Sequence, residues 1–366
     1  MRKIISILFL LTVLIPPAGP GLAQEGTPIP EEGILVQGFL FNRTTDEPGP
    51  DGIEVMLHAW DESGAARGMV HGVSGPGGAF EFEGVNVEQG VFYAVMAVYQ
   101  GATNLSETFV ADEDGRLPEI EVAIYETTTD TTNINIDLLH IVIGTGQGGL
   151  TVAEYYALSN QGDRTVVSSG ALEQGREDTL VFTLPPHAAN ISFPSANPKR
   201  YRVFPGGFAD SSGISPGVGT SQVVVTYVLP YEVGPLTIIR PVPFDVGEIK
   251  VFMPHQIELQ LDVLDGTEEG VKMLGSNAEA YEVYALGPLQ QGDPVELVVT
   301  GTLPSPSLPA GEDTIIINAG TRPSLLWGAS ILGVALITGG LWWWRRGEER
   351  SAGEEVLGPG ESLDES

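Results

Sequence analysis

Apolar and polar residues alternate along most of the chain between residues 33 and 300. Runs with this period of two recur between clusters of turn-forming residues, at Ile53–Trp60, Val91–Tyr99, Thr179–Leu184, Gln222–Leu229 and Ile257–Val263. A period of two is typical of strands with one buried face, and many short strands separated by turns favour antiparallel sandwiches. We therefore expect an all-β chain built of tandem antiparallel β-sandwiches.

A continuous apolar run at the N-terminus departs from this alternation. It follows Arg2 and Lys3, and small residues stand at Gly21 and Ala23, the spacing that a signal peptidase requires. This pattern predicts a cleaved secretory signal peptide over residues 1–23.

A second apolar run, Leu325–Trp344, is long enough to cross a membrane. It carries no charge, and a helix of this length spans the roughly 30 Å hydrocarbon core of a bilayer. Arg345 and Arg346 follow it directly, which places the C-terminus in the cytoplasm by the positive-inside rule. The sequence predicts a single-pass type I protein of the cell membrane, with its ectodomain extracytoplasmic and an acidic cytoplasmic tail over 345–366.

The composition narrows the range of partners. The chain has 48 acidic and 17 basic residues, a formal net charge of −31, and no cysteine. Seven of the acidic residues lie in the tail, so most of the negative charge belongs to the predicted ectodomain. Such a surface repels nucleic acid, and we expect no nucleic-acid partner. Without cysteine there can be neither disulfides nor thiolate metal ligands.

Two polar segments divide the ectodomain. Residues 126–133 are threonine-rich with nothing to bury, which predicts a linker or an exposed crossing between domains. Residues 301–323 are rich in proline and serine and predict an extended stalk before the membrane. Between these segments, 134–300 has room for one or two further β-sandwich domains.

The first domain has a distinctive layout. Its strands GILVQGFLFN and GIEVMLHAW are followed by the glycine turn GPGGAFEFEGV and by VFYAVMAVYQG. Over residues 33–125 this order resembles the carboxypeptidase regulatory-like, or transthyretin (prealbumin)-like, domain. The resemblance implies a seven-stranded prealbumin-like sandwich that serves as an accessory or binding module without chemistry of its own.

The region after the linker is similar to domains of bacterial single-pass envelope proteins of unassigned function. The matching residues lie in 150–165, LTVAEYYALSNQGDRT, and in 223–231, VVVTYVLPY. This resemblance implies no activity and no site residues.

A glycine pattern after an apolar run invites comparison with dinucleotide-binding enzymes. Gly144, Gly146 and Gly149 have G-x-G-x-x-G spacing, which binds pyrophosphate only where a helix starts at the last glycine. Residues 150–158 alternate with period two and are rich in aromatic and β-branched residues. We therefore predict a strand there, a glycine-rich turn before it, and no nucleotide site.

Two other patterns resemble catalytic motifs. Gly213-Ile-Ser215-Pro-Gly217 matches the nucleophile elbow, but Pro216 cannot supply the backbone N–H that this elbow needs for its oxyanion hole. His255 and Glu258 have the spacing of zinc ligands, but no histidine follows His255 to complete the usual three protein ligands. We expect neither site and predict no catalytic residue.

Acidic turns give weak candidates for calcium. Asp112 and Asp114 carry hard oxygen ligands in one turn, and 46–51 and 265–269 are similar. None contains a complete calcium loop, so structural calcium is an alternative to a solvated turn and no other cofactor is predicted.

We therefore expect a non-enzyme that binds or scaffolds a protein or polysaccharide at the cell envelope. Alternatives are an accessory subunit of a membrane assembly, such as secretion or cytochrome maturation machinery, and, last, an envelope hydrolase. Small residues four apart, Ala329 with Gly333 and Ala335 with Gly339, would also allow a helix-mediated dimer.

Overall fold

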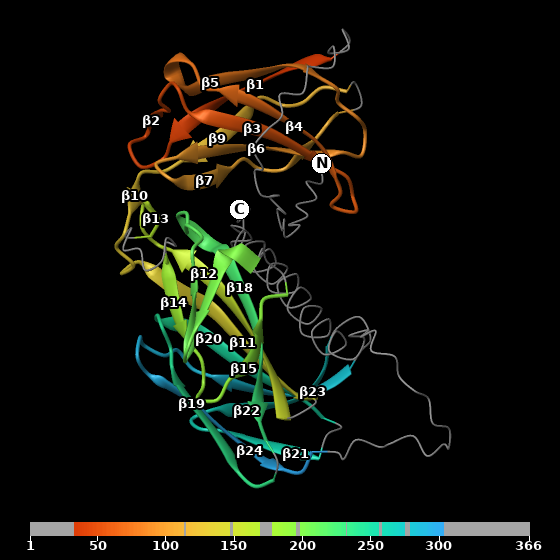
Figure 1. The fold of residues 1–366 in the computed structure, drawn as a ribbon, viewed down its shortest axis with the longest axis vertical. Helices are drawn as coiled ribbons and strands as arrows, with labels where there is room; N and C mark the ends of the chain where they lie inside the picture. Colours follow the sequence, from red (N-terminus) through yellow and green to blue (C-terminus); the bar gives the residue numbers. More distant parts are fainter. Residues whose placement is uncertain are drawn as a thin grey trace, which may run out of the picture. The chain divides into compact units, whose positions relative to one another are not determined.

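In the part of the chain that the structure describes, the regular structure is almost entirely β (Figure 1). The computed structural model describes residues 33–303 apart from 113–114, 147–148, 169–177, 195–197, 232, 256–257 and 275–278. Within this part there is no α-helix, and two short 3-10 helices occur, η1 (Pro76–Gly78) and η2 (Pro198–Arg200). The chain divides into two compact units: unit 1 comprises residues up to 135, 158–182 and 196–221, and unit 2 comprises 136–157, 183–195 and 222 onwards.

Two sheets form the N-terminal part of unit 1. In the first, β1 pairs with β5 and β2 along one side and with β9 along the other; in the second, the order is β4-β3-β6-β7, with β8 also paired to β6. The strands are β1 (Ile34–Asn42), β2 (Glu47–Pro48), β3 (Glu54–Trp60), β4 (Ala66–Val73), β5 (Ala79–Val85), β6 (Phe92–Tyr99), β7 (Ala102–Leu105), β8 (Phe109–Val110) and β9 (Ile120–Ile124).

The alternating sequence puts one side of each sheet into a shared core. On β5, Phe80 and Phe82 are buried while Glu81 and Glu83 are exposed, because successive side chains point to opposite faces. The core joins residues of both sheets: Val36, Leu40, Val55, Leu57, Phe80, Phe82, Val85, Val91, Tyr93, Val95, Ala97, Ile120, Val122 and Ile124. Each fully buried large side chain contributes roughly 1.5–3 kcal/mol, so this core holds the two sheets together.

The predicted linker 126–133 has ordered strand pairing in unit 1. Within it, β10 (Thr127–Thr128) runs parallel to β13 (Thr165–Val166). Next to β10, Glu126 accepts a hydrogen bond from the Tyr99 hydroxyl at 2.7 Å. Hydrogen bonds, rather than a buried apolar face, hold this polar segment in place.

A further small sheet completes unit 1. It has the order β14-β17-β16, with β14 (Leu180–Thr183), β17 (Gly207–Asp210) and β16 (Tyr201–Phe204). The rings of Phe182 and Phe208 stack with centroids 4.8 Å apart and pack the two strands together.

The largest sheet has seven strands in the order β15-β18-β12-β11-β20-β23-β22. Their bounds are β11 (Ile134–Gly146), β12 (Gly149–Asn160), β15 (Ala189–Ser192), β18 (Gly217–Pro230), β20 (Val246–Pro254), β22 (Thr267–Leu274) and β23 (Glu279–Leu286). The central strands β12 and β18 are buried on both faces over part of their length, and they read as nearly continuous apolar runs for that reason.

A three-stranded sheet lies within unit 2, in the order β19-β24-β21. Its strands are β19 (Leu236–Pro241), β21 (Leu259–Val263) and β24 (Pro294–Gly301), and both pairings are antiparallel. Buried and exposed residues alternate along β21 and β24, as expected for strands with one face on a core.

The expectation of antiparallel sheets throughout was wrong in detail. Parallel pairs occur among the described strands: β1 with β9, β10 with β13 and β11 with β20. Each joins segments far apart in the sequence, whereas neighbouring strands joined by a short turn must be antiparallel. The alternation of period two shows which residues are buried. It does not show whether neighbouring strands run parallel or antiparallel.

The predicted signal peptide, membrane-spanning segment and tail lie outside the described residues, as does the stalk beyond residue 303. Within the described residues, no helix has the length and hydropathy that crossing a membrane requires.

Candidate functional site

The glycines of the G-x-G-x-x-G pattern lie at the ends of two strands that are hydrogen-bonded neighbours. β11 ends at Gly146 and its neighbour β12 starts at Gly149, so the prediction of a strand at this place is confirmed. Gly149 has φ +152°, and a Cβ there would lie 2.0 Å from the carbonyl oxygen of Leu229. Glycine is needed here because another backbone strand passes close by. A strand has no helix dipole to hold a phosphate.

The serine and histidine patterns are not assembled into catalytic geometry. Ser215 lies in a loop just before β18, where the nucleophile elbow would need a helix. His255 pairs with Glu282 rather than with Glu258, its Nδ1 lying 3.0 Å from Glu282 Oε1. Glu258 instead lies 3.5 Å from the Thr302 hydroxyl, which donates to it.

Carboxylates of two of the acidic turns make local contacts. Asp112 Oδ1 accepts a hydrogen bond from the backbone N–H of Arg116 at 2.8 Å, which closes the turn; Asp114 lies outside the described residues. Glu269 faces Lys272 and Lys250. Among residues 33–303 as described, no three His, Cys, Asp or Glu side chains are grouped to hold a metal. Calcium at Asp112 and Asp114 stays a prediction.

A charged pair that the motif search missed lies inside unit 2. Glu154 on β12 is 1% exposed and Arg240 on β19 is 2% exposed, and Arg240 Nε lies 3.3 Å from Glu154 Oε1. The Tyr227 hydroxyl donates to Glu154 Oε1 at 2.7 Å, and the Tyr156 hydroxyl donates to Oε2. Arg240 Nη1 donates to the Tyr156 oxygen at 2.8 Å.

These contacts connect the two sheets of unit 2, since β12 and β18 belong to the seven-stranded sheet and β19 to the three-stranded one. Burial raises the pKa of Tyr156 and of Tyr227 above the ordinary value, and the Glu154 charge raises both further, so both hydroxyls keep their protons and donate. Full burial suits a structural role, since a substrate could not reach these atoms. A glutamate inside the run VAEYYAL was the available sequence indication.

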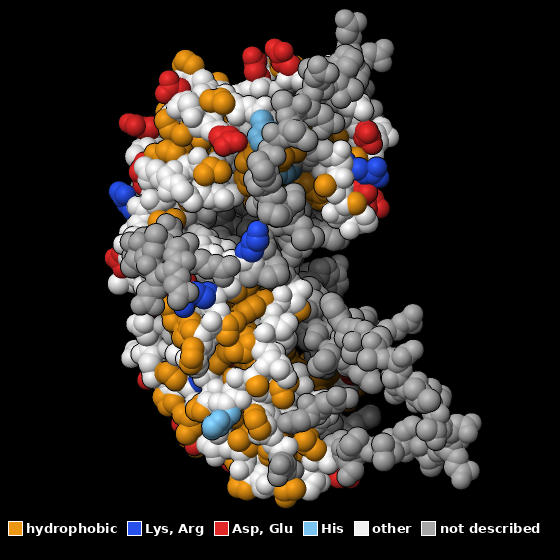
Figure 2. All heavy atoms as spheres, viewed as in Figure 1, with side chains coloured by type: hydrophobic (Ala, Val, Ile, Leu, Met, Phe, Trp, Pro, Cys, Tyr) orange, Lys and Arg blue, Asp and Glu red, His pale blue; other side chains and the backbone are white. Residues whose placement is uncertain are grey.

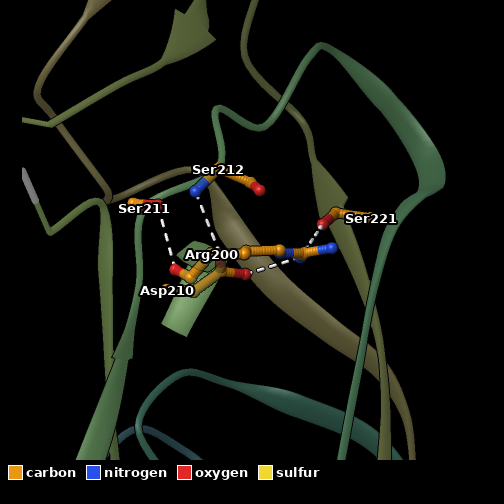
Figure 3. Close-up of polar contacts among 5 residues, drawn as sticks. All are labelled: Arg200, Asp210, Ser211, Ser212 and Ser221. Carbon is orange, nitrogen blue, oxygen red and sulfur yellow. Dashed lines mark hydrogen bonds and ion pairs between the residues drawn. The ribbon is translucent and has the colours of Figure 1, made fainter. Parts of the chain in front are cut away.

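A second charged pair lies in unit 1, where Arg200 reaches Asp210 on β17 (Figure 3). Arg200 Nε and Nη2 donate to the two carboxylate oxygens at 2.8 and 2.6 Å, and the backbone N–H of Ser212 donates to Oδ1 at 2.9 Å. Arg200 Nη2 also lies 3.4 Å from the Ser221 hydroxyl. The Asp210 side chain is 1% exposed. Ser212 and Ser221 contact this ion pair, and none of the residues in these contacts is a histidine.

Several exposed apolar side chains lie on one sheet of unit 1. We define the outer face as the side of the β4-β3-β6-β7 sheet that points away from the unit 1 core. It carries Met69 and Val73 of β4, Val98 of β6, Leu105 of β7 and Val110 of β8, which are 53%, 63%, 39%, 51% and 48% exposed. In the view of Figure 2, hydrophobic and histidine side chains lie among acidic and other polar ones on this unit, and hydrophobic side chains also gather on the other unit.

For this sheet, the sequence patterns predicted only that its segments are strands. In the run IEVMLHAW, Met56 and Trp60 are apolar residues at positions that the alternation assigns to the solvent side, and this was the available sequence signal. Only the fold showed that this side meets no other sheet of the unit 1 core.

Comparison with known proteins places the chain in no family. No protein-family model matches it, and no curated protein matches it. Solved structures with a detectable match include one described as a "putative protease" from Parabacteroides distasonis ATCC 8503, with 13% identity and a TM-score of 0.22. The match covers 46% of this chain and 40% of that chain.

Proposed function

We propose that this chain is a non-catalytic, membrane-anchored extracytoplasmic protein that binds or scaffolds a protein partner at the cell envelope. In this proposal a cleaved signal peptide exports it and a helix over 325–344 anchors it. The ectodomain consists of tandem β-sandwiches, the first of them prealbumin-like and related to carboxypeptidase regulatory-like domains.

One observation carries the proposal. The outer face of unit 1 leaves contiguous strands with apolar side chains exposed, where an antiparallel sheet with one solvated side ordinarily carries polar ones. Exposed apolar side chains grouped on one sheet face favour a site of interaction there. Apolar side chains favour a protein over a polysaccharide as the partner, because a polysaccharide presents mainly hydroxyl groups.

Site-directed photocrosslinking in intact cells tests the proposal. A photoreactive amino acid replaces Val98 or Leu105 on the outer face, and, as a matched control, Glu83 on the solvent side of the other sheet. We expect the two outer-face positions to capture the same identified protein and Glu83 not to. The tagged partner should then recover this chain, and Val98→Glu should abolish the capture.

Two results would contradict the proposal. Equal capture from Glu83 would show that the adducts are not specific to the outer face. Hydrolytic activity of the pure chain that is lost on neutralising one carboxylate would show that it is an enzyme. If capture instead requires the native 325–344 segment, the accessory-subunit alternative gains support.

A further inference from the structure

Two histidines and three methionines occupy neighbouring positions on the outer face. In the strand register, Met56 on β3 lies directly opposite His71 on β4 and opposite Met96 on β6. His58, two residues further along β3, lies opposite Met69 on β4. Residues directly opposite in an antiparallel pair have Cβ atoms about 4.5–5.5 Å apart. We name these five residues the Met–His cluster.

Alternation shows that all five side chains point to the same side. Val55 and Leu57 on β3 are buried in the core, so Met56 and His58 point away from it. Val95 and Ala97 flank Met96 in the same way. On β4, Val70 packs against the core, and a Cβ at Gly72 would lie 3.0 Å from the Phe82 ring. Met69 and His71 therefore belong to the outer face.

The imidazoles are arranged as metal-ligating imidazoles commonly are. His71 Nδ1 lies 3.4 Å from Glu54 Oε1, so the ring nitrogen that faces away from this carboxylate is Nε2. A carboxylate behind a ligating histidine is a common feature of metal sites. His58 Nε2 is buried and has no hydrogen-bond partner among the described residues. A buried polar nitrogen without a partner is costly unless something binds it.

We propose that the Met–His cluster binds a monovalent copper ion, Cu(I). Soft thioether donors select Cu(I) over Zn²⁺, Ca²⁺ and Mg²⁺, and imidazole is a good copper ligand. Zn²⁺ takes its protein ligands from imidazole, thiolate and carboxylate groups, so a cluster in which three of the five donors are thioethers favours Cu(I). The inference goes beyond the proposed function, since the cluster needs no protein partner to bind copper.

Metal titration of the full-length chain in detergent tests this. Cu(I) is supplied anaerobically with ascorbate in the presence of bathocuproine disulfonate, whose coloured copper complex reports competition. We expect the chain to withdraw one copper ion from the chelator, and X-ray absorption at the copper edge to show both sulfur and nitrogen ligands.

Variants place the site. Met56→Leu with Met96→Leu should weaken copper binding at least tenfold, and His71→Asn about tenfold or more, by analogy with the loss when a metal site is disturbed. Met-to-Leu exchange conserves volume, so the thermal unfolding curve should stay close to that of the wild type. Matched controls are Met273→Leu, an exposed methionine on β22, and His255→Asn, an exposed histidine that also pairs with a glutamate.

Three results would overturn the inference: no copper withdrawn by the wild type, equal loss in the Met273 and His255 controls, or a ligand shell of nitrogen and oxygen only. Preferential binding of Zn²⁺ over Cu(I) would also overturn it. A failed titration together with successful crosslinking would leave the outer face as a protein-binding surface, so the two proposals fail separately.

Discussion

The buried pair Glu154–Arg240 allows a quantitative test of how unit 2 is held together. The perturbation is Glu154→Gln, which keeps the size of the side chain and removes its charge. The variant leaves the Arg240 guanidinium 2% exposed, with the Tyr156 hydroxyl and a neutral amide as its remaining partners. Arg240→Met removes the positive charge instead. It leaves the Glu154 carboxylate with the Tyr227 and Tyr156 hydroxyls as donors and with no cation beside it.

The magnitude follows from burial. Removing one partner of a buried ion pair costs about 3–5 kcal/mol, because the remaining charge loses its counter-ion and cannot reach water. We expect each single variant to lose stability in this range. The double variant should lose clearly less than the two losses added together, since it leaves no uncompensated charge; a coupling of at least ~2 kcal/mol is expected for residues in one network.

Urea unfolding of the full-length chain measures these differences, followed by near-ultraviolet circular dichroism of the tyrosines. Arg43→Met is the control, because its pair with Glu121 lies at the surface, with both side chains more than a third exposed. Surface pairs contribute less than about 1 kcal/mol. Additive losses in the Glu154–Arg240 cycle, or single losses no larger than the control's, would refute the reasoning.

Three further predictions concern other parts of the fold. Burial, together with the charge of Lys250, lowers the pKa of His140 from 6.5 to about 4. The unfolded state therefore takes up this proton more readily than the folded state, and the free energy of unfolding falls as the pH drops from 6.5 towards 4. The full loss is roughly 3 kcal/mol, and in His140→Phe the stability measured by urea unfolding should lose most of this slope between pH 6.5 and 4; an unchanged slope would contradict the assignment. Gly149→Ala should lower the melting temperature strongly because its Cβ meets a backbone oxygen at 2.0 Å, while Gly144→Ala, whose nearest atom is 3.9 Å away, should not. Asp210→Asn should cost about 2 kcal/mol in chemical unfolding, since it removes the anion of a partly exposed pair, and a neutral result would show that this pair is not structural.

Local sequence patterns were sufficient to predict where strands occur, but they were not sufficient to predict which strands pair with each other. Leu150 to Leu158 could be assigned as a strand because period two is a property of successive residues, and the same pattern excluded a helix after Gly149. The parallel pairing of β11 with β20 joins residues about 110 positions apart, and the sequence of neither strand indicates which strand it pairs with. Residues 126–133 were predicted as a linker from polarity alone, which does not show that β10 pairs with β13.

The candidate sites show the same division. The sequence by itself determined the β character of the described residues and the strand at Gly149, because each depends on neighbouring residues and their backbone preferences. Only the tertiary structure brought Glu154 to Arg240 and placed His58 and Met56 beside residues of β4 and β6. Such contacts are decided by which strands become neighbours and which face each presents to the core. That choice depends on the burial of the whole chain rather than on any short stretch of it.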